Sequence, residues 1–322
     1  MQKISIITGV TGQDGAYLSK LLLEQGYRVV GLTRSYNKEN LSKLRFLGIL
    51  DKIEIQEVDL TDLSQVIRLF QEFKPAEVYN LAAQSSVSLS FQQPISTISF
   101  NIISTLNLLE AIKVVSLNIR MYQASSSEMF GHVENLPITE HHALHPLSPY
   151  AISKATAHWT TINYRESYGM WVGSGILFNH ESYLRSPNFF IKKVLRSAIA
   201  ISLGKQDTLE VGNIDIKRDF GYAPAYVEAM WLMLQQDEPD DYIICSGTSV
   251  TLRSIIEHVF SVLNIPAERL VINSNYYRPT DIVDIHGDNS KAKMKLGWTY
   301  ERSFFNVLEE LLEDEARYTT TT

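Results

Sequence analysis

The chain has 322 residues, of which 45% are hydrophobic and 20% are charged, a globular composition that excludes disordered, collagen-like and coiled-coil proteins. Its net charge of −7 offers no broad cationic face, so we expect no nucleic-acid partner. One cysteine, Cys245, cannot form an internal disulfide, and no Cys/His spacing resembles a metal site. Without a signal-like segment or an apolar run of roughly 20 residues, we expect a cytoplasmic protein with no membrane partner.

Short apolar runs alternate with amphipathic stretches through the first half of the chain. The predicted strands are residues 4–8, 29–33, 53–58, 78–81, 121–125 and 171–177. The predicted helices include residues 17–25, 63–73, 98–115 and 189–203. This alternation predicts a parallel sheet with helices on both faces.

The alternation loosens after about residue 169, where polar stretches such as 212–222 and 273–281 predict loops. The predicted fold class is therefore α/β, a Rossmann-type doubly wound parallel sheet with a smaller, interleaved C-terminal lobe. We expect the sheet domain to span residues 1–178. The lobe should span residues 179–322, with some of its segments returning to the sheet.

A glycine-rich loop, GVTGQDG, follows the first predicted strand directly and begins the first helix. In a dinucleotide-binding loop, glycines permit a tight turn, close approach of the backbone to a pyrophosphate, and packing of helix on strand. Chance can produce this glycine spacing in a turn-rich loop, but the position between strand and helix favours a cofactor. The residues expected at the cofactor are Gly9, Thr11, Gly12, Gln13, Asp14 and Gly15.

The ends of the next strands supply further candidates. The second strand ends at Arg34, where NAD-binding folds place a carboxylate on the ribose; arginine suits a 2′-phosphate and favours NADP. A solvated surface arginine is the alternative. The third strand would bring Asp59 and Leu60 to the adenine, and the fourth would bring Leu81, Ala82 and Ala83 under the dinucleotide. Ordinary strand-end packing explains these five residues equally well.

A tyrosine and a lysine, Tyr150 and Lys154, lie four residues apart and therefore on one helix face. A phenol with a pKa near ~10 needs a nearby cation to act as a base at neutral pH, and Lys154 can supply it. Such a pair is common by chance, but its occurrence in the same chain as the glycine loop favours a catalytic role. At the end of the fifth strand, the hydroxyl of Ser126 can bind the reacting oxygen of a substrate.

The carboxylate of Glu128 follows two residues after Ser126. Simple hydride transfer needs only a hydroxyl and a phenol, whereas removal of a carbon-bound proton with loss of water needs a further acid/base. The alternative is a carboxylate that caps the start of a helix. We assign Ser126, Glu128, Tyr150 and Lys154 as candidate catalytic residues.

Six segments carry a family resemblance: TGVTGQDG at 8–15, YNLAAQS at 79–85, YQASSSE at 122–128, SPYA at 148–151, NYRESYGM at 163–170 and GILFNHES at 175–182. With these segments the chain resembles the extended short-chain dehydrogenases/reductases that modify nucleotide sugars, and most closely the GDP-mannose 4,6-dehydratase family. The resemblance continues to residues 296–298 and so covers nearly the whole chain.

The resemblance implies a lyase of deoxysugar biosynthesis that converts GDP-D-mannose to GDP-4-keto-6-deoxy-D-mannose. NADP would accept hydride from C4 while Tyr150, supported by Lys154 and Ser126, takes the hydroxyl proton. Glu128 would remove the C5 proton and protonate the departing C6 hydroxyl, after which hydride returns to C6.

The resemblance also implies binding residues. The expected substrate-binding residues are Ser85, Ser126, Glu128, Asn179, Lys193, Gly212, Arg218 and Arg278. The cofactor would also contact Ser85, Tyr150, Lys154, His180 and Arg185. Lys193 on the solvated face of a helix and His180 as a core histidine are the alternatives.

Three other functions stay open: a GDP-heptose 4,6-dehydratase, a related nucleotide-sugar 4-reductase or epimerase, and a non-catalytic NADP-binding sensor. The reductase and the epimerase do not need Glu128, and the sensor has no use for the full catalytic set. By the resemblance we expect a homodimer formed through helices 98–115 and 150–168. A homotetramer is the less secure alternative, because the loop at residues 35–44 is compact.

Overall fold

A computed structural model describes residues 2–37 and 39–319. In this part of the chain the main sheet has seven strands, all parallel, in the order β10-β6-β5-β4-β1-β2-β3. The order reverses direction at β1, as in doubly wound folds. The predicted α/β, Rossmann-type fold is therefore confirmed. The strands are β1 (Ile4–Thr8), β2 (Arg28–Thr33), β3 (Glu54–Glu57), β4 (Glu77–Asn80), β5 (Arg120–Ser126), β6 (Val172–Leu177) and β10 (Tyr242–Ile244).

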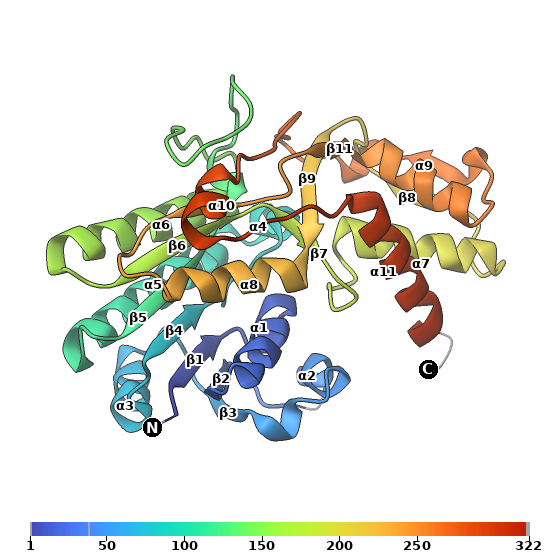
Figure 1. Ribbon diagram of the computed structural model, residues 1–322. Coiled ribbons are helices and arrows are strands. Elements are labelled where there is room, and N and C mark those ends of the chain that lie inside the picture. The colour runs from blue at the N-terminus through green and yellow to red at the C-terminus, as the bar shows by residue number, and fades with distance from the viewer. Residues whose placement is uncertain (1, 38, 320–322) are drawn as a thin grey trace.

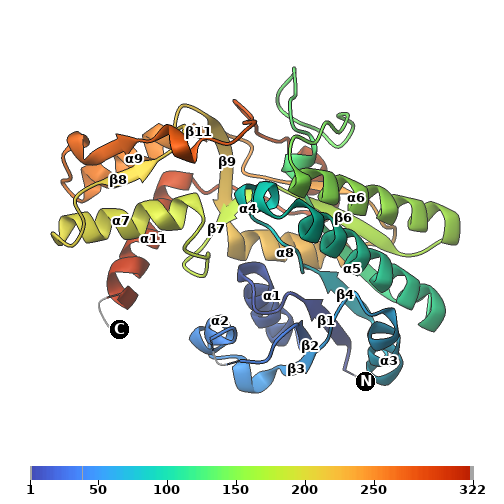
Figure 2. The same cartoon turned by 180° about the vertical axis from the view of Figure 1, so that it is seen from behind.

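Helices cover both faces of this sheet (Figures 1 and 2). Ile7 of β1 lies in a core with α1 and α8, whereas its neighbour Ile6 packs with α3 and α5 on the other face. Both side chains are fully buried, which explains why the strands are continuously apolar rather than alternating. The covering helices are α1 (Gln13–Glu24) and α8 (Ala223–Leu234) on one face and α3 (Leu63–Phe73), α5 (Pro94–Val115) and α6 (Pro149–Tyr168) on the other.

The long helix α5 is apolar and long enough to span a membrane by length and composition. In the structure it packs against α3 and α6 and contributes Leu108 and Ile112, both fully buried, to the core beneath the sheet. A core helix of an α/β domain has the same composition, because its inner face must cover a buried sheet. The packing accounts for the apolar character of α5.

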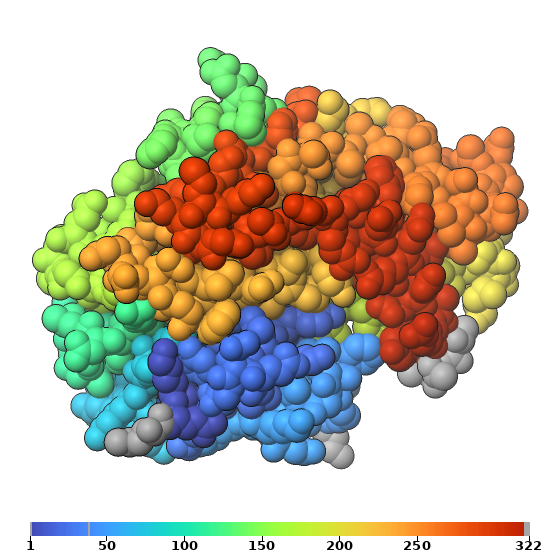
Figure 3. Space-filling model, viewed as in Figure 1, coloured from blue at the N-terminus to red at the C-terminus, as the bar shows by residue number. Residues whose placement is uncertain are grey.

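The lobe has its own small sheets and its own apolar core. Figure 3 shows α8 as a band between the N-terminal segments and the C-terminal segment. One sheet pairs β7 (Asn179–Glu181), β9 (Lys217–Tyr222) and β11 (Ser249–Thr251), and the other pairs β8 (Leu209–Val211) with β12 (Leu270–Ile272). The helices α7 (Phe190–Ser202), α9 (Leu252–Val262) and α11 (Phe304–Thr319) pack around them.

The prediction of a loop over residues 212–222 is wrong in its second half, which forms β9, the central strand of its sheet. The polar residues Arg218 and Asp219 suggested a loop, but both are buried in the strand. Asp281 pairs with the guanidinium of Arg218, and donors from Ser246 and Gly247 satisfy the carboxylate of Asp219. Tertiary partners therefore permit a strand where the local sequence predicts none.

Short elements complete the fold. The remaining helices are α2 (Ser42–Phe46), α4 (Val87–Gln92) and α10 (Ser290–Leu296), and the 3-10 turns are η1 (Leu50–Lys52), η2 (Ser127–Met129), η3 (Ala267–Arg269) and η4 (Ser274–Tyr276). After the excursion through β7 to β9, the chain returns to the main sheet as β10, which pairs with β6. The domain boundary at residue 178 stays a prediction.

Candidate active site

A cleft of about 860 Å³ runs along the carboxyl ends of the main-sheet strands and reaches the lobe. In an open α/β sheet this edge is where ligands bind, beside the point at which the strand order reverses. The glycine loop, the ends of β2 to β5, the start of α6 and residues of β7 and β9 all line it. Sequence-predicted residues from both parts of the chain therefore meet in one cavity.

The glycine loop forms a cradle that leaves no room for side chains. Gly9 has φ +68°, and a Cβ there would lie 3.0 Å from the backbone of Ala82; a Cβ on Gly15 would lie 2.4 Å from the Gly9 carbonyl oxygen. The hydroxyl of Thr8 accepts hydrogen bonds from the backbone N–H groups of Leu81 and Ala82, which fixes the loop to β4.

Helix α1 begins beside this cradle, and its N-cap, Gly12, provides no side-chain hydrogen bond to the first turn. Unsatisfied N–H groups at a helix N-terminus attract phosphate. The space, the free donors and the cations described next therefore fit a dinucleotide diphosphate.

Three cationic side chains line the cleft near this cradle: Arg34 at the end of β2, Lys43 of α2 and Arg185 after β7. Burial lowers the pKa of Lys43, and the nearby charge of Asp14 partly offsets that effect. Arg185 lies over the ring of Phe189, with 3.7 Å between the guanidinium carbon and the ring centre. The sequence did not predict Lys43, since only the packing of α2 brings it to the cleft.

The remaining predicted cofactor residues also line the cleft. They are Thr11, Gln13, Asp14, Asp59, Leu60, Leu81, Ala82, Ala83, Ser85 and His180.

The catalytic candidates come from the end of β5 and the first turns of α6. Ser148 starts α6 by accepting a hydrogen bond from the N–H of Ala151 at 3.1 Å, and Pro149 occupies the first helical turn. Tyr150 and Lys154 then face the cleft from one side of the helix. The Nζ of Lys154 donates a hydrogen bond of 2.8 Å to the carbonyl oxygen of Ala124 on β5. The pair is therefore held against the strand that carries Ser126.

Burial shifts the pKa values of both groups. It lowers the pKa of Lys154 to about 8, although the charge of Asp14 opposes the shift. It also raises the pKa of Tyr150 to about 12; the hydroxyl of Ser126 lowers that value and the charge of Glu128 raises it. The phenol is therefore protonated near neutral pH in the protein alone, and it needs additional positive charge in the cleft before it can accept a proton.

Ser126 and Glu128 stand at the start of η2, and the backbone N–H of Glu128 donates to the Ser126 hydroxyl at 3.3 Å. Both side chains line the cleft beside Tyr150. No backbone N–H group of the described residues donates a hydrogen bond to the carboxylate of Glu128. Helix capping is therefore not the role of this carboxylate in the structure.

Arg218, Arg278 and Asn179 bring the lobe to the cleft. The guanidinium of Arg218 donates to the carbonyl oxygen of Ile282 at 2.6 Å and to the carboxylate of Asp281 at 3.0 Å, so its position is fixed. Burial lowers the pKa of Arg218, and the negative charge of Glu128 opposes that shift. The candidate catalytic carboxylate and the candidate nucleotide-binding arginine are therefore close enough to interact.

Two predicted substrate residues, Lys193 and Gly212, do not line the cleft. The Nζ of Lys193 donates to the Glu210 carbonyl oxygen at 2.6 Å and lies 4.6 Å from the ring centre of Tyr276. A Cβ on Gly212 would lie 2.7 Å from the carbonyl oxygen of Tyr276. Both residues therefore contact the segment around η4, and their role at a substrate stays a prediction.

Comparisons with known proteins agree with this geometry. The family model described as GDP-mannose 4,6 dehydratase matches residues 6–311. A GDP-mannose 4,6-dehydratase of Sinorhizobium fredii is 39% identical over 342 residues, covering 98% of this chain and 97% of the relative. GDP-mannose 4,6 dehydratase 1 of Arabidopsis thaliana is 42% identical over 325 residues, covering 98% and 90%. The structure of RMD from Pseudomonas aeruginosa complexed with NADPH has a TM-score of 0.82 at 26% identity, covering 98% of this chain and 100% of that one.

Proposed function

The chain belongs to the GDP-mannose 4,6 dehydratase family, and from this membership we propose that it converts GDP-D-mannose to GDP-4-keto-6-deoxy-D-mannose in the cytoplasm. The observation that carries the proposal is the meeting of Ser126, Glu128, Tyr150 and Lys154 beside a glycine cradle in one cleft. The family match supplies the substrate class, and the cleft supplies groups for the acid/base steps that the reaction needs.

The proton transfers fall to the residues of β5, η2 and α6. Tyr150 accepts the proton of the C4 hydroxyl in its phenolate form, which Lys154 and the positive charge of a bound oxidised nicotinamide would favour, and Ser126 binds the same oxygen. The resulting 4-ketone acidifies C5, so that Glu128 removes the C5 proton and gives a proton to the departing C6 hydroxyl. A bound nicotinamide would supply a reversible hydride acceptor, so that the hydride lost at C4 could return to C6 while C5 takes up a solvent-exchangeable proton, and no external reductant is consumed.

We propose NADP as the cofactor. Arg34 is exposed at the end of β2 and lines the cleft, where a guanidinium can bind a 2′-phosphate through paired donors. Lys43 and Arg185 add positive charge near the glycine cradle, which suits the diphosphate of either dinucleotide. The preference for NADP over NAD therefore rests on Arg34.

Arg218 and Arg278 are the residues that we propose for the diphosphate of the GDP-sugar. Both lie in the lobe and line the cleft together with Asn179 and Ser85. Arg218 is only 5% exposed and already oriented by Asp281, so a bound diphosphate would find a guanidinium that loses little freedom on binding.

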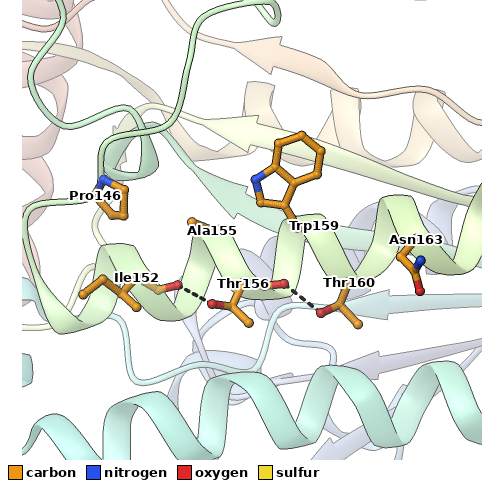
Figure 4. Close-up of a pocket in the computed structure, with 7 residues that line it drawn as sticks. All are labelled: Pro146, Ile152, Ala155, Thr156, Trp159, Thr160 and Asn163. Atoms are coloured by element: carbon orange, nitrogen blue, oxygen red, sulfur yellow. Dashed lines mark hydrogen bonds between the residues drawn. The ribbon is translucent and has the colours of Figure 1, made fainter.

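We also propose that the protein is a homodimer. The outer sides of α5 and α6 expose Ile95, Ile103, Ile152 and Trp159, with Trp159 59% exposed. A groove of about 480 Å³ lies along α6 at Trp159, Thr156 and Ile152 (Figure 4). An apolar face of this kind on two adjacent helices suits a second copy of the same face. In such a dimer the partner would pack against the outer face of α6, the helix that carries Tyr150 and Lys154.

One assay tests the proposed reaction. The purified protein is incubated with GDP-D-mannose and no external reductant, while mass spectrometry follows the sugar and absorbance follows the nicotinamide. We expect loss of one water with no net change in NADPH. Stoichiometric oxidation of NADPH with a keto sugar would instead support a reductase, and binding without turnover would support a sensor. Comparison of kcat/KM with a GDP-heptose decides between the hexose and the heptose.

A further inference from the structure

The side chains of Asp14 and His180 are within hydrogen-bond distance of each other although 166 positions separate them. The Nδ1 of His180 lies 2.7 Å from the carbonyl oxygen of Phe178, and its Nε2 lies 3.0 Å from Oδ2 of Asp14. A carbonyl oxygen only accepts hydrogen bonds, so Nδ1 must carry a proton, and the contact with Asp14 requires a second one. With a proton in each of these two hydrogen bonds, the pair has no net charge.

The structure holds this pair in place from several directions. The amide of Gln13 donates to the His180 carbonyl oxygen at 3.1 Å, and its carbonyl accepts from the Ser182 hydroxyl at 2.8 Å. The ring of Tyr226 stacks on the imidazole, with 4.7 Å between ring centres. His180 is 6% exposed, so it cannot turn away to water without breaking these contacts.

Asp14 lies in the first turn of α1 and lines the cleft, with 22% of its side chain exposed. This is the turn that carries the free donors for a diphosphate. A bare carboxylate here would repel phosphate oxygens that the helix N-terminus attracts. An anion at the phosphate site needs positive charge beside it. Among the groups in contact with Asp14, the neutral amide of Gln13 donates to Oδ1 and the titratable imidazole of His180 contacts Oδ2, while Arg185 and Lys43 add positive charge nearby.

On the premise that the cleft binds a nicotinamide dinucleotide, we propose that the proton of His180 neutralises Asp14 and so admits the cofactor diphosphate to the start of α1. When the pair loses this proton it becomes an anion beside the phosphates, and cofactor affinity falls. Asp14 and His180 are therefore positioning residues whose joint charge controls cofactor binding.

The surrounding charges shift the pKa values of both members of the pair in the directions that favour the ion pair. Burial by itself would raise the pKa of Asp14, but His180 and Arg185 lower it to about 2. Burial also lowers the pKa of His180, but the charge of Asp14 and its hydrogen bond raise it above the usual value. Other charged or titratable groups around the pair are Lys43 of α2, Tyr122 of β5, Tyr150 and Lys154 of α6, Glu181 of β7, Arg185 after β7 and Tyr226 of α8.

A double-mutant cycle on cofactor binding tests the proposal without reference to turnover. The dissociation constant of NADPH is measured by nicotinamide fluorescence for the wild type, Asp14→Asn, His180→Gln and the double variant. We expect His180→Gln to weaken binding about tenfold or more, because it leaves the carboxylate uncompensated. The double variant should return to within about threefold of the wild type, because it removes both charges.

The matched control is His258→Gln. His258 of α9 pairs with Glu309 of α11 at 3.0 Å, the same kind of pair, but neither residue lines the cleft. This variant should bind NADPH as the wild type does. If His180→Gln does not fold, Asp14→Asn still tests the proposal: we expect affinity at least equal to the wild type, and a tenfold loss would overturn the proposal.

The pH dependence supplies the second measurement. As the pH rises through the raised pKa of His180, the wild type should lose NADPH affinity, while Asp14→Asn should lose much less. Nitrogen NMR of labelled histidine should show both ring nitrogens of His180 protonated at neutral pH. A double variant that binds as weakly as His180→Gln, or a His180 with one bare nitrogen at neutral pH, overturns the inference while the proposed dehydratase stands. Failure of the wild type to bind NADPH would contradict the proposed function itself.

Discussion

The ammonium of Lys154 lies 5.9 Å from the centre of the Tyr150 ring, one helical turn along α6. This distance lets the cation act on the phenol without forming a direct ion pair with it. Because the backbone of β5 holds Lys154, the relationship between the two groups is part of the folded structure and does not depend on a bound ligand.

The first prediction concerns pH. The charged form of Lys154 is present below its pKa of about 8 and is lost above it, so kcat of the wild type should fall as the pH rises through that value. Lys154→Arg should move this fall to higher pH, because guanidinium stays charged. Lys154→Met should lower kcat about 100-fold or more, whereas Lys20→Met on the exposed side of α1 should not. An unchanged pH profile in Lys154→Arg would contradict the assigned role.

The second prediction separates oxidation from elimination. Glu128→Gln should still allow oxidation at C4 but lower the rate of water loss about 100-fold or more. Stopped-flow absorbance should then show reduced nicotinamide accumulating on the protein, which the wild type returns too quickly to accumulate. The control is Glu134→Gln, because Glu134 is exposed and lies in the segment between η2 and α6. Formation of the keto-deoxy product at the wild-type rate by Glu128→Gln would remove Glu128 from the mechanism.

The third prediction distinguishes two cations at the cofactor. Arg34→Ala should weaken NADP binding about tenfold and leave NAD binding nearly unchanged, since only NADP carries the 2′-phosphate. Lys43→Met should weaken both, because the diphosphate is common to them. Arg45→Ala on α2 does not line the cleft and serves as the control in the same titrations. Equal losses of NADP and NAD affinity in Arg34→Ala would argue against its proposed contact.

The fourth prediction concerns the nucleotide lobe. Arg218→Met should raise KM for GDP-mannose strongly, because it removes a buried, oriented cation from the cleft and leaves Asp281 with only the longer ion pair to Arg278. Lys193→Met should change KM by less than about twofold, since Lys193 lies outside the cleft and its contacts are solvent-exposed. Steady-state kinetics at constant NADP compare the two. A large rise in KM for Lys193→Met would show that the substrate extends to the segment around η4.

The fifth prediction concerns assembly. Trp159→Glu should convert a dimer to a monomer, because it places a charge on the apolar outer face of α6. Val262→Glu is the matched control, since Val262 is apolar and 46% exposed and ends α9, which packs on α7, α11 and β11 in the lobe. Light scattering with size-exclusion chromatography reports the mass. A wild-type monomer, or a dimer that survives Trp159→Glu, would contradict the proposed interface.

Much of the sheet domain could be predicted from the sequence because its signals are local. A strand, a glycine loop and a helix follow one another without interruption, and Tyr150 and Lys154 are neighbours on a single helix. The carboxyl ends of parallel strands meet at one edge, so residues after successive strands must come together. Ser126 and the glycine loop are examples, and the structure brings both to the same cleft.

Residues whose position depends on distant packing could not be predicted. Lys43 lies on a five-residue helix that follows an irregular stretch, and nothing in the local pattern directs it to the cleft. The strand β9 is polar because its side chains meet partners from residues 246–247 and 281–282. The pair of Asp14 and His180 joins α1 to β7. Asp14 belongs to the glycine loop and His180 to the segment at 175–182, and neither motif indicates that the two side chains are in contact.

Transfer of an isotope label from C4 tests the central claim most directly. GDP-D-mannose carrying deuterium at C4 is converted by the protein with catalytic NADP, and NMR and mass spectrometry locate the label in the product. We predict deuterium at C6, a solvent-derived hydrogen at C5, loss of one water and no label in the free cofactor. Loss of the deuterium to solvent, or its recovery in released NADPH, would contradict an internal hydride return catalysed by Ser126, Glu128, Tyr150 and Lys154.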